Sequence, residues 1–226
     1  MPGSGAVTRN TLRQQIADAL RDEVLAGRLA AGSEFTVKQI AEQYEVSATP
    51  VREALVDLSA QGLLDSVQHR GFRVRVFSVD DFRGMIEART LIVDGIFRRL
   101  VERGTAPGSG EQLVSVRRRA EEARRAALSG SLDVLIGYDL RFWRELSGLV
   151  GNIYISEFLH RIRVQCWVFS VPHLKAQPDL RSTLWSGHNE LIDAVTRADA
   201  EEVRRLVHAY NQHGLAWADG LKVAGT

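Results

Sequence analysis

The chain has 226 residues, of which 45% are hydrophobic and 25% are charged. This is enough apolar side chain for one large core or two ordinary ones, which excludes disordered, collagen-like and linker-like proteins. The 29 Lys and Arg residues nearly balance the 28 Asp and Glu residues and leave a formal net charge of +1. No overall field therefore draws the chain toward polyanions, and any nucleic-acid surface must be local.

The single cysteine, Cys166, excludes an internal disulfide and a structural zinc site built on several thiolates. Its sequence neighbours are apolar, so we interpret it as a packing residue. The uncharged stretch from Val164 to Leu174 is much shorter than the roughly 20 apolar residues that span a bilayer. Arg9 and Arg13 are not followed by the apolar block that a secretory signal needs. We therefore expect a cytoplasmic protein that does not bind a membrane.

Three short helices and a β-hairpin are predicted in the first third of the chain. Apolar residues recur at helical spacing over about 10–26, and two shorter amphipathic segments follow Thr36 and Ser47, both of which are residues that cap helices. In the segment 64–76, Phe72 and Val74 alternate with arginines, as in a strand with two different faces. These elements predict a winged helix-turn-helix domain over 8–76.

The rest of the chain, 77–226, is predicted to be an all-α bundle of six or seven helices, which makes the whole protein mainly α. Glycine and proline residues interrupt an otherwise helical pattern. The expected helices are 79–103, 110–129, 132–149, 152–170, 180–197 and 199–221.

The third helix of the first domain carries the residue types that contact DNA. Ser47, Thr49 and Arg52 lie off the apolar stripe of this helix, so they can reach phosphates and base edges. The hairpin tip holds His69 and Arg70, which suit contact with phosphate or a minor groove. The competing interpretation is a helical subdomain with an ordinary solvated face, to which the balanced net charge gives some weight.

The segment from Leu20 to Val76 resembles the DNA-binding domain of the GntR superfamily of bacterial transcription regulators. The matching residues are Leu25 to Leu29, Ile40 to Glu42, Val46 and Ser47, Thr49 to Leu55, Leu58, Gly62 to Leu64 and Arg70 to Phe72. The resemblance implies a homodimer that reads a short palindrome of double-stranded DNA. The DNA-binding candidates are Lys38, Ser47, Thr49, Arg52, His69, Arg70 and Gly71. Family members usually carry Arg where this chain has Ala48, so a guanine contact of roughly 1–3 kcal/mol is expected to be missing.

The helical part, from about Asp80 to Trp217, resembles the FCD effector-binding domain of the FadR subfamily. The matching pieces are Glu87 to Arg89, Tyr138 to Trp143, Gly151 and Asn152, Gly187 to Val195 and Ala198 to Ala200. Many members of that subfamily bind a divalent metal through one Asp and three His. Here the resemblance places Asp139 and His188 at two of those positions, and Trp143 and Tyr210 at the other two.

We therefore expect no cofactor, because neither an indole nor a neutral phenol replaces a histidine ligand well. The competing hypothesis is a metal held by Asp139, His188 and His213, since His213 lies three residues beyond Tyr210. An aromatic site instead suits a small organic acid or acyl compound, whose carboxylate would pair with an arginine. The effector-binding candidates are Arg89, Asp139, Trp143, His188 and Tyr210.

The combination of domains predicts a transcription regulator, expected to act as a repressor that an effector releases from DNA. Three alternatives stay open. The pocket could be collapsed onto Trp143 and Tyr210, leaving DNA binding independent of ligand. Separately, His188 and Trp143 could be ordinary core residues and Asp139 an acid on a helix surface. The helical domain could sense a metal, or it could be an enzyme using Asp139 and His188. The enzyme is disfavoured because the chain has no HExxH, G-x-S-x-G or phosphate-binding glycine motif.

Overall fold

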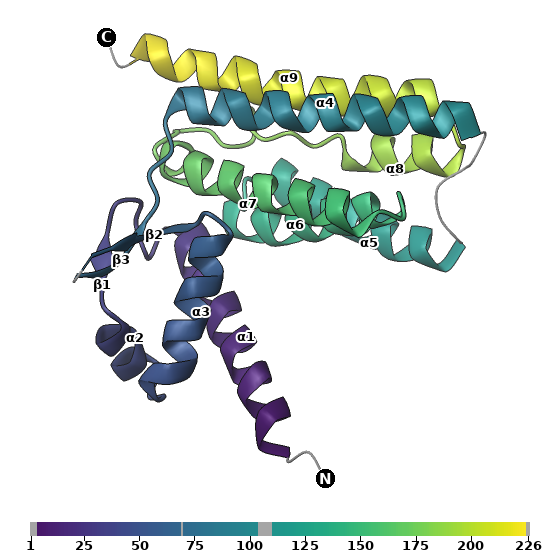
Figure 1. Ribbon diagram of the computed structural model, residues 1–226. Coiled ribbons are helices and arrows are strands. Elements are labelled where there is room, and N and C mark those ends of the chain that lie inside the picture. The colour runs from purple at the N-terminus through teal and green to yellow at the C-terminus, as the bar shows by residue number, and fades with distance from the viewer. Residues whose placement is uncertain (1–3, 69, 104–109, 225–226) are drawn as a thin grey trace. The chain divides into compact units, whose positions relative to one another are not determined.

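The computed structural model describes residues 4–68, 70–103 and 110–224, and these form two compact units (Figure 1). The first contains the described residues up to Phe77 together with Trp167–Lys175. The second contains Ser78–Cys166 and the described residues from Ala176 onward. Each unit is described separately below.

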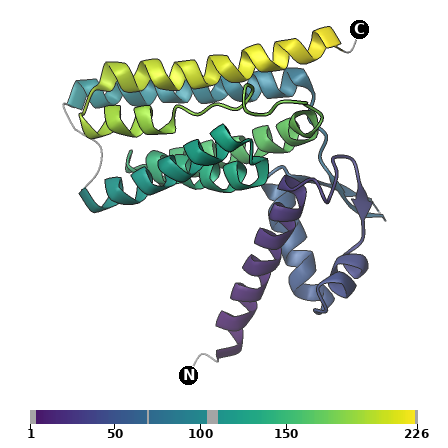
Figure 2. The ribbon, with the colours of Figure 1, turned by 180° about the vertical axis from the view of Figure 1, so that it is seen from behind.

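The first unit is a winged helix-turn-helix, as the sequence predicted. Its helices are α1 (Ser4–Leu25), α2 (Val37–Gln43) and α3 (Ala48–Ala60), and its strands are β1 (Glu34–Phe35), β2 (Leu64–Val67) and β3 (Gly71–Val74). The strands form an antiparallel sheet in the order β1-β3-β2 (Figures 1 and 2). Strand β1 was not predicted, because two residues are too few to show an alternating pattern.

The helix-turn-helix is held by capping and by a buried stripe. Thr36 and Gln39 form a reciprocal capping box at the start of α2. On α3, Val51, Ala54, Leu55 and Leu58 are all at most 1% exposed, and this helix packs against α1. Ser47 occupies the N-cap position of α3, but its hydroxyl makes no capping hydrogen bond. The opposite face of α3 is therefore not needed to pack the domain.

The second unit is a helical bundle, and in the part of the chain that the structure describes it has six helices. They are α4 (Val79–Arg103), α5 (Gly110–Ser129), α6 (Leu132–Gly148), α7 (Ile153–Lys175, whose last turns belong to the first unit), α8 (His188–Thr196) and α9 (Ala200–Ala224). Helices α4 and α9 run side by side in both views (Figures 1 and 2). A cluster around Phe142, Trp143, Leu191 and Ile192 forms a large part of the core.

Several helix boundaries differ from the predicted ones. Helix α1 begins at Ser4 rather than at about residue 10. Helix α7 continues through Pro172 to Lys175 rather than ending at about residue 170. Burial of Val171 and Leu174, which are 1% and 5% exposed, offsets the backbone hydrogen bond that proline cannot make. Helix α8 begins at His188 rather than at residue 180. The hydroxyl of Thr183 donates to the carbonyl of Asp179 at 3.0 Å, a local turn that competes with helix formation.

Within the described residues, no helix combines the length and the apolar character needed to cross a membrane.

Replacement of Gly71 by alanine is expected to destabilise the winged unit by about 1–3 kcal/mol. Gly71 has a φ of 115°, and a Cβ there would lie 2.4 Å from the carbonyl oxygen of Phe35 on β1. The measurement is urea unfolding followed by circular dichroism. The matched control is Gly84→Ala on α4, where a Cβ would meet nothing within 4 Å. That variant should gain about 0.5–1 kcal/mol. Equal stability of the two variants would contradict this account.

Candidate functional site

Helix α3 presents a polar, solvent-exposed N-terminal region. Ser47, Thr49 and Arg52 are exposed, whereas Val51 between them is fully buried. Lys38 on α2 is also exposed, with 84% of its side chain accessible, and it pairs with Glu42 at 3.7 Å. A pair this exposed and this long contributes little, so the lysine can exchange Glu42 for another anion.

The wing places further positive charge on the surface. Arg70 follows β2 and is exposed, and on or just after β3 Arg73 and Arg75 are exposed as well. Gly71 begins β3, and its missing side chain allows the close approach to β1 described above. His69, the remaining DNA-binding candidate of the wing, lies outside the described residues.

In the second unit, Asp139 is the centre of a buried hydrogen-bonded group. Its Oδ1 accepts a hydrogen bond of 3.0 Å from Trp143 Nε1, one turn along α6. His188 Nε2, at the first residue of α8, lies 3.0 Å from the same oxygen. All three side chains are at most 4% exposed. The i, i+4 spacing on α6 brings Asp139 and Trp143 to one face of the helix, where α8 supplies the histidine.

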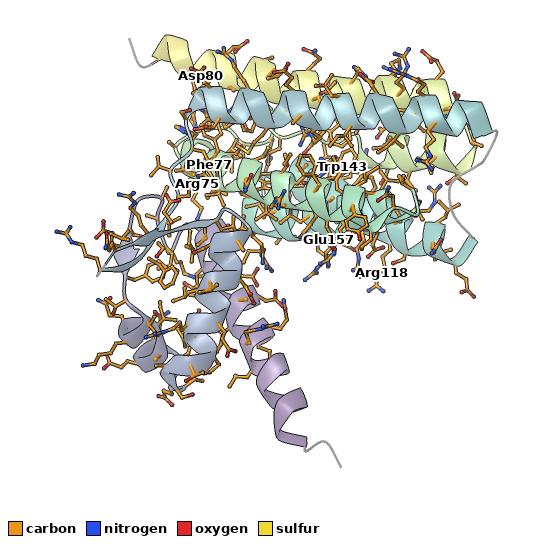
Figure 3. The ribbon with its side chains drawn as sticks, in the orientation of Figure 1. Arg75, Phe77, Asp80, Arg118, Trp143 and Glu157 are labelled. Carbon is orange, nitrogen blue, oxygen red and sulfur yellow. The ribbon has the colours of Figure 1, made fainter. Side chains whose placement is uncertain are left out.

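Aromatic rings surround this group. Trp143 and Tyr210 have ring centroids 4.9 Å apart, and Trp185, from the segment before α8, lies 4.8 Å from Tyr210 and 4.6 Å from His188. Figure 3 shows Trp143 among the helices of the bundle, whereas Arg118 lies on the outer side of α5. Contacts of this kind add about 0.5–1.5 kcal/mol each beyond the area that they bury.

Arg89 on α4 joins the same cluster. It is 2% exposed, and its guanidinium carbon lies 4.8 Å from the ring centroid of Tyr210. Its Nε donates to Asn211 Oδ1 at 2.9 Å, and Asn211 Nδ2 in turn donates to Thr90 Oγ1 at 2.8 Å. The five residues predicted as an effector site are therefore linked by direct contacts, from Arg89 through Tyr210, Trp143 and Asp139 to His188.

Arg163 on α7 completes the cluster and was missed in the sequence. Its guanidinium carbon lies 3.7 Å from the ring centroid of Trp143 and 5.4 Å from that of Tyr210, and the residue is 3% exposed. The atoms Nε and Nη1 are buried and make no hydrogen bond. The sequence did contain a signal, because Arg163 shares a helical face with the apolar residues Leu159 and Cys166.

Burial shifts the ionisation of this cluster. The pKa of Arg163 is lowered to about 10, mainly by burial and secondly by the nearby charge of Arg89. At about 1.4 kcal/mol for each pH unit, this corresponds to roughly 3 kcal/mol of unfavourable free energy at every pH below about 10, where Arg163 is charged in both states. Burial, followed by the charge of Asp139, raises the pKa of Tyr210, so its phenol stays neutral at physiological pH. Burial likewise raises the pKa of the Cys166 thiol.

The residues present do not fit a divalent metal. Asp139 and His188 hydrogen-bond directly to each other. His213 hydrogen-bonds through Nε2 to the carbonyl of Thr183 at 2.7 Å, and His208 pairs with Asp94. Across residues 4–68, 70–103 and 110–224, no group of three His, Cys, Asp or Glu side chains is placed to hold an ion. The two positions where histidines would be needed carry Trp143 and Tyr210, and the cation in contact with both of their rings is the guanidinium of Arg163.

Comparisons with known proteins cover both units. Residues 12–74 match the bacterial regulatory proteins of the gntR family, and residues 84–213 match the FCD domain. The chain is 27% identical over 214 residues to a protein of Paenarthrobacter nicotinovorans named "Probable D-xylose utilization operon transcriptional repressor", covering 95% of this chain and 90% of that one. It is 23% identical over 205 residues to the HTH-type transcriptional repressor RspR of Escherichia coli, covering 89% and 85%.

Among solved structures, the chain superposes on E. coli McbR/YncC with a TM-score of 0.76 at 21% identity, over 93% of this chain and 98% of that one. These relatives are regulators of transcription and not enzymes.

Replacement of Asp139 by asparagine is expected to destabilise the helical unit by about 3 kcal/mol. Asparagine keeps the shape and an acceptor oxygen for Trp143 and His188, but it removes the negative charge that partly compensates Arg89 and Arg163. Chemical unfolding of the full chain measures the effect. Asp133→Asn, an exposed position on the same helix, should change stability by no more than about 0.5 kcal/mol. A similar loss in both variants would show that the charge of Asp139 is not needed in the core.

Proposed function

Because this chain belongs to the GntR family of bacterial regulatory proteins and carries an FCD domain, we propose that it represses transcription as a homodimer bound to a palindromic operator. In this proposal, a small organic acid binds in the helical unit and lowers the affinity for DNA. By thermodynamic linkage, operator DNA weakens acid binding by the same factor. The protein would act in the cytoplasm, where bacterial DNA is located.

The observation that carries the DNA-binding part is the exposed polar face of α3. The N-terminal residues of a recognition helix contact base edges in the major groove, while basic groups nearby contact phosphates. Thr49 and Arg52 are exposed on α3, and Lys38, Arg70 and Arg73 add positive charge on α2 and the wing. This supports a local DNA surface on a chain whose net charge is only +1.

A homodimer is supported by the apolar side chains that the second unit leaves exposed. The large apolar side chains that are exposed on this unit are Leu91, Val114, Leu128, Val134, Ile153 and Tyr154, with exposures from 48% to 85%. Isolated exposed apolar residues are common, so the proposal requires several of these six to lie together in one contiguous patch. Two-fold protein symmetry would then match two operator half-sites.

An effector is supported by the composition of the buried cluster, in which aromatic rings surround two arginines and one aspartate. Small-molecule sites are mostly apolar and contain a few placed polar groups, and an arginine pairs well with a carboxylate. Arg89 is the sequence-predicted partner of that carboxylate. The alternative is a regulator that is independent of ligand. The hydrogen bonds that Asp139 receives from Trp143 and His188 favour it, because they also suit a purely structural core.

Replacement of Arg52 by alanine is expected to abolish specific operator binding and leave the fold intact, because the side chain is exposed. Loss of one good base contact costs about 1–3 kcal/mol, and two subunits double that loss. The probe is a duplex selected from a random library by the wild-type protein, and affinity is measured by fluorescence anisotropy at a fixed salt concentration.

The control for this experiment is Arg118→Ala, which removes the same charge from an exposed position on α5. It should bind the selected duplex about as tightly as the wild-type protein. Unchanged affinity of Arg52→Ala, or an equal loss in both variants, would remove Arg52 from the DNA surface.

The selected duplexes are also expected to share a two-fold symmetric sequence, and sedimentation should find two chains on each duplex. Symmetry in the DNA and in the protein must agree, because the half-site spacing follows from the dimer geometry. A single chain bound to an asymmetric site would contradict the homodimer while leaving DNA binding itself intact.

A further inference from the structure

We infer that Arg163 and Arg89 form a metal-independent binding site for a monocarboxylate, in which the Arg163 guanidinium is the cation that holds the carboxylate. The inference rests on the proposed function, since the bound acid would be the effector. It assigns a role to Arg163, which no motif in the sequence marks, and it predicts that the ligand carries a single negative charge.

The first argument is the balance of buried charge. Among the described residues, only three charged side chains are buried: Arg89, Asp139 and Arg163. All three belong to the cluster around Trp143 and Tyr210, where two positive charges face one negative charge. A proton on His188 would only add to the positive excess. A buried charge without compensation is unfavourable, and one added negative charge would neutralise this cluster.

The second argument is the unmet hydrogen-bonding capacity of Arg163. Buried polar groups in folded proteins nearly always have partners, yet Nε and Nη1 of this guanidinium have none. Contact with the faces of Trp143 and Tyr210 compensates part of the lost hydration of the charge, but it gives the N–H groups no acceptor. Arg89 differs, because its Nε already donates to Asn211. Of these two arginines, Arg163 is therefore the one whose N–H groups can donate hydrogen bonds to a ligand.

The third argument concerns the class of ligand. A carboxylate is a planar acceptor that suits a guanidinium, and its single charge equals the excess in the cluster. A phosphate group would bring between one and two negative charges, and a dicarboxylate would bring two, so each leaves a net negative charge in the buried site. Trp185 and Tyr210 are only partly buried, and their rings offer contact to an apolar or aromatic portion of the acid.

A purely structural role for Arg163 makes the opposite stability prediction. If the arginine holds the core through its ring contacts, removing it should lower the unfolding temperature. If it is kept for an anion, its replacement by an apolar residue of similar length removes an uncompensated charge and should leave the ligand-free protein equally stable or more stable.

The test is thermal unfolding of the full chain in excess EDTA, with carboxylates and their neutral amides as matched probes. The probes are benzoate and phenylacetate, benzamide and phenylacetamide, and the dicarboxylate phthalate. A ligand that binds only the native state raises the unfolding temperature. We expect at least one of the two monocarboxylates to raise it, while its amide and phthalate do not. Calorimetry then gives the Kd of that acid.

The decisive variant is Arg163→Met, and its control is Arg161→Met, an exposed position on the same helix. Arg163→Met should unfold at the wild-type temperature or above it in the absence of acid, and its Kd for the acid should weaken at least about tenfold. Arg163→Lys keeps the charge and should retain part of the affinity. Arg161→Met should bind the acid as the wild-type protein does.

Several results would overturn the inference. These are the absence of any response to both monocarboxylates in EDTA, equal responses to acid and amide, a response that appears only when EDTA is omitted, or an Arg163→Met variant that is less stable and still binds the acid. Operator binding tests the proposed function separately. If the acid binds through Arg163 but leaves operator affinity unchanged, the site stands and the effector role fails. If an acid releases DNA equally from wild-type protein and Arg163→Met, the regulator stands and this site fails.

Discussion

The excess of positive charge inside the helical unit is the constraint on which this account of the protein depends. Arg89 and Arg163 are buried with Asp139 as their only charged counterpart among the buried described residues. Burial and the nearby charge of Arg89 lower the pKa of Arg163, so the charged guanidinium destabilises the folded state. The aromatic rings of Trp143 and Tyr210 reduce this cost but do not supply acceptors. Such an arrangement suits a site that binds an anion, whereas in a purely structural core it would lower the stability of the fold.

The fold could be predicted from the sequence wherever the apolar pattern extended over many residues and was bounded by glycine or proline. Helices 79–103 and 110–129 begin and end where glycine, proline and the apolar period placed them. The predictions failed where local hydrogen bonds or tertiary burial decided the outcome. Strand β1 exists because β3 pairs with it, the start of α8 is delayed by the turn at Asp179, and α7 continues through Pro172 because its neighbours are buried. None of these three features has a periodicity of its own.

The buried cluster around Trp143 and Tyr210 shows a similar division. Position-by-position resemblance pointed to Arg89, Asp139, Trp143, His188 and Tyr210, and the structure brings these five into contact; their function stays a prediction. Arg163 was missed because it lies on α7, a helix on which the resemblance marks no site residue. Asn211 and Trp185 are known as members of the cluster only from the contacts that they make. His213, considered as a replacement ligand, is instead engaged by the carbonyl of Thr183.

A crystal structure of the protein with the monocarboxylate that most raises its unfolding temperature, grown in EDTA, would test the central claim most directly. The account predicts carboxylate oxygens within hydrogen-bonding distance of the Arg163 guanidinium, with the remainder of the acid against Trp185 or Tyr210 and no metal ion between ligand and protein. A carboxylate bound elsewhere, or a metal ion held by Asp139 and His188, would contradict it.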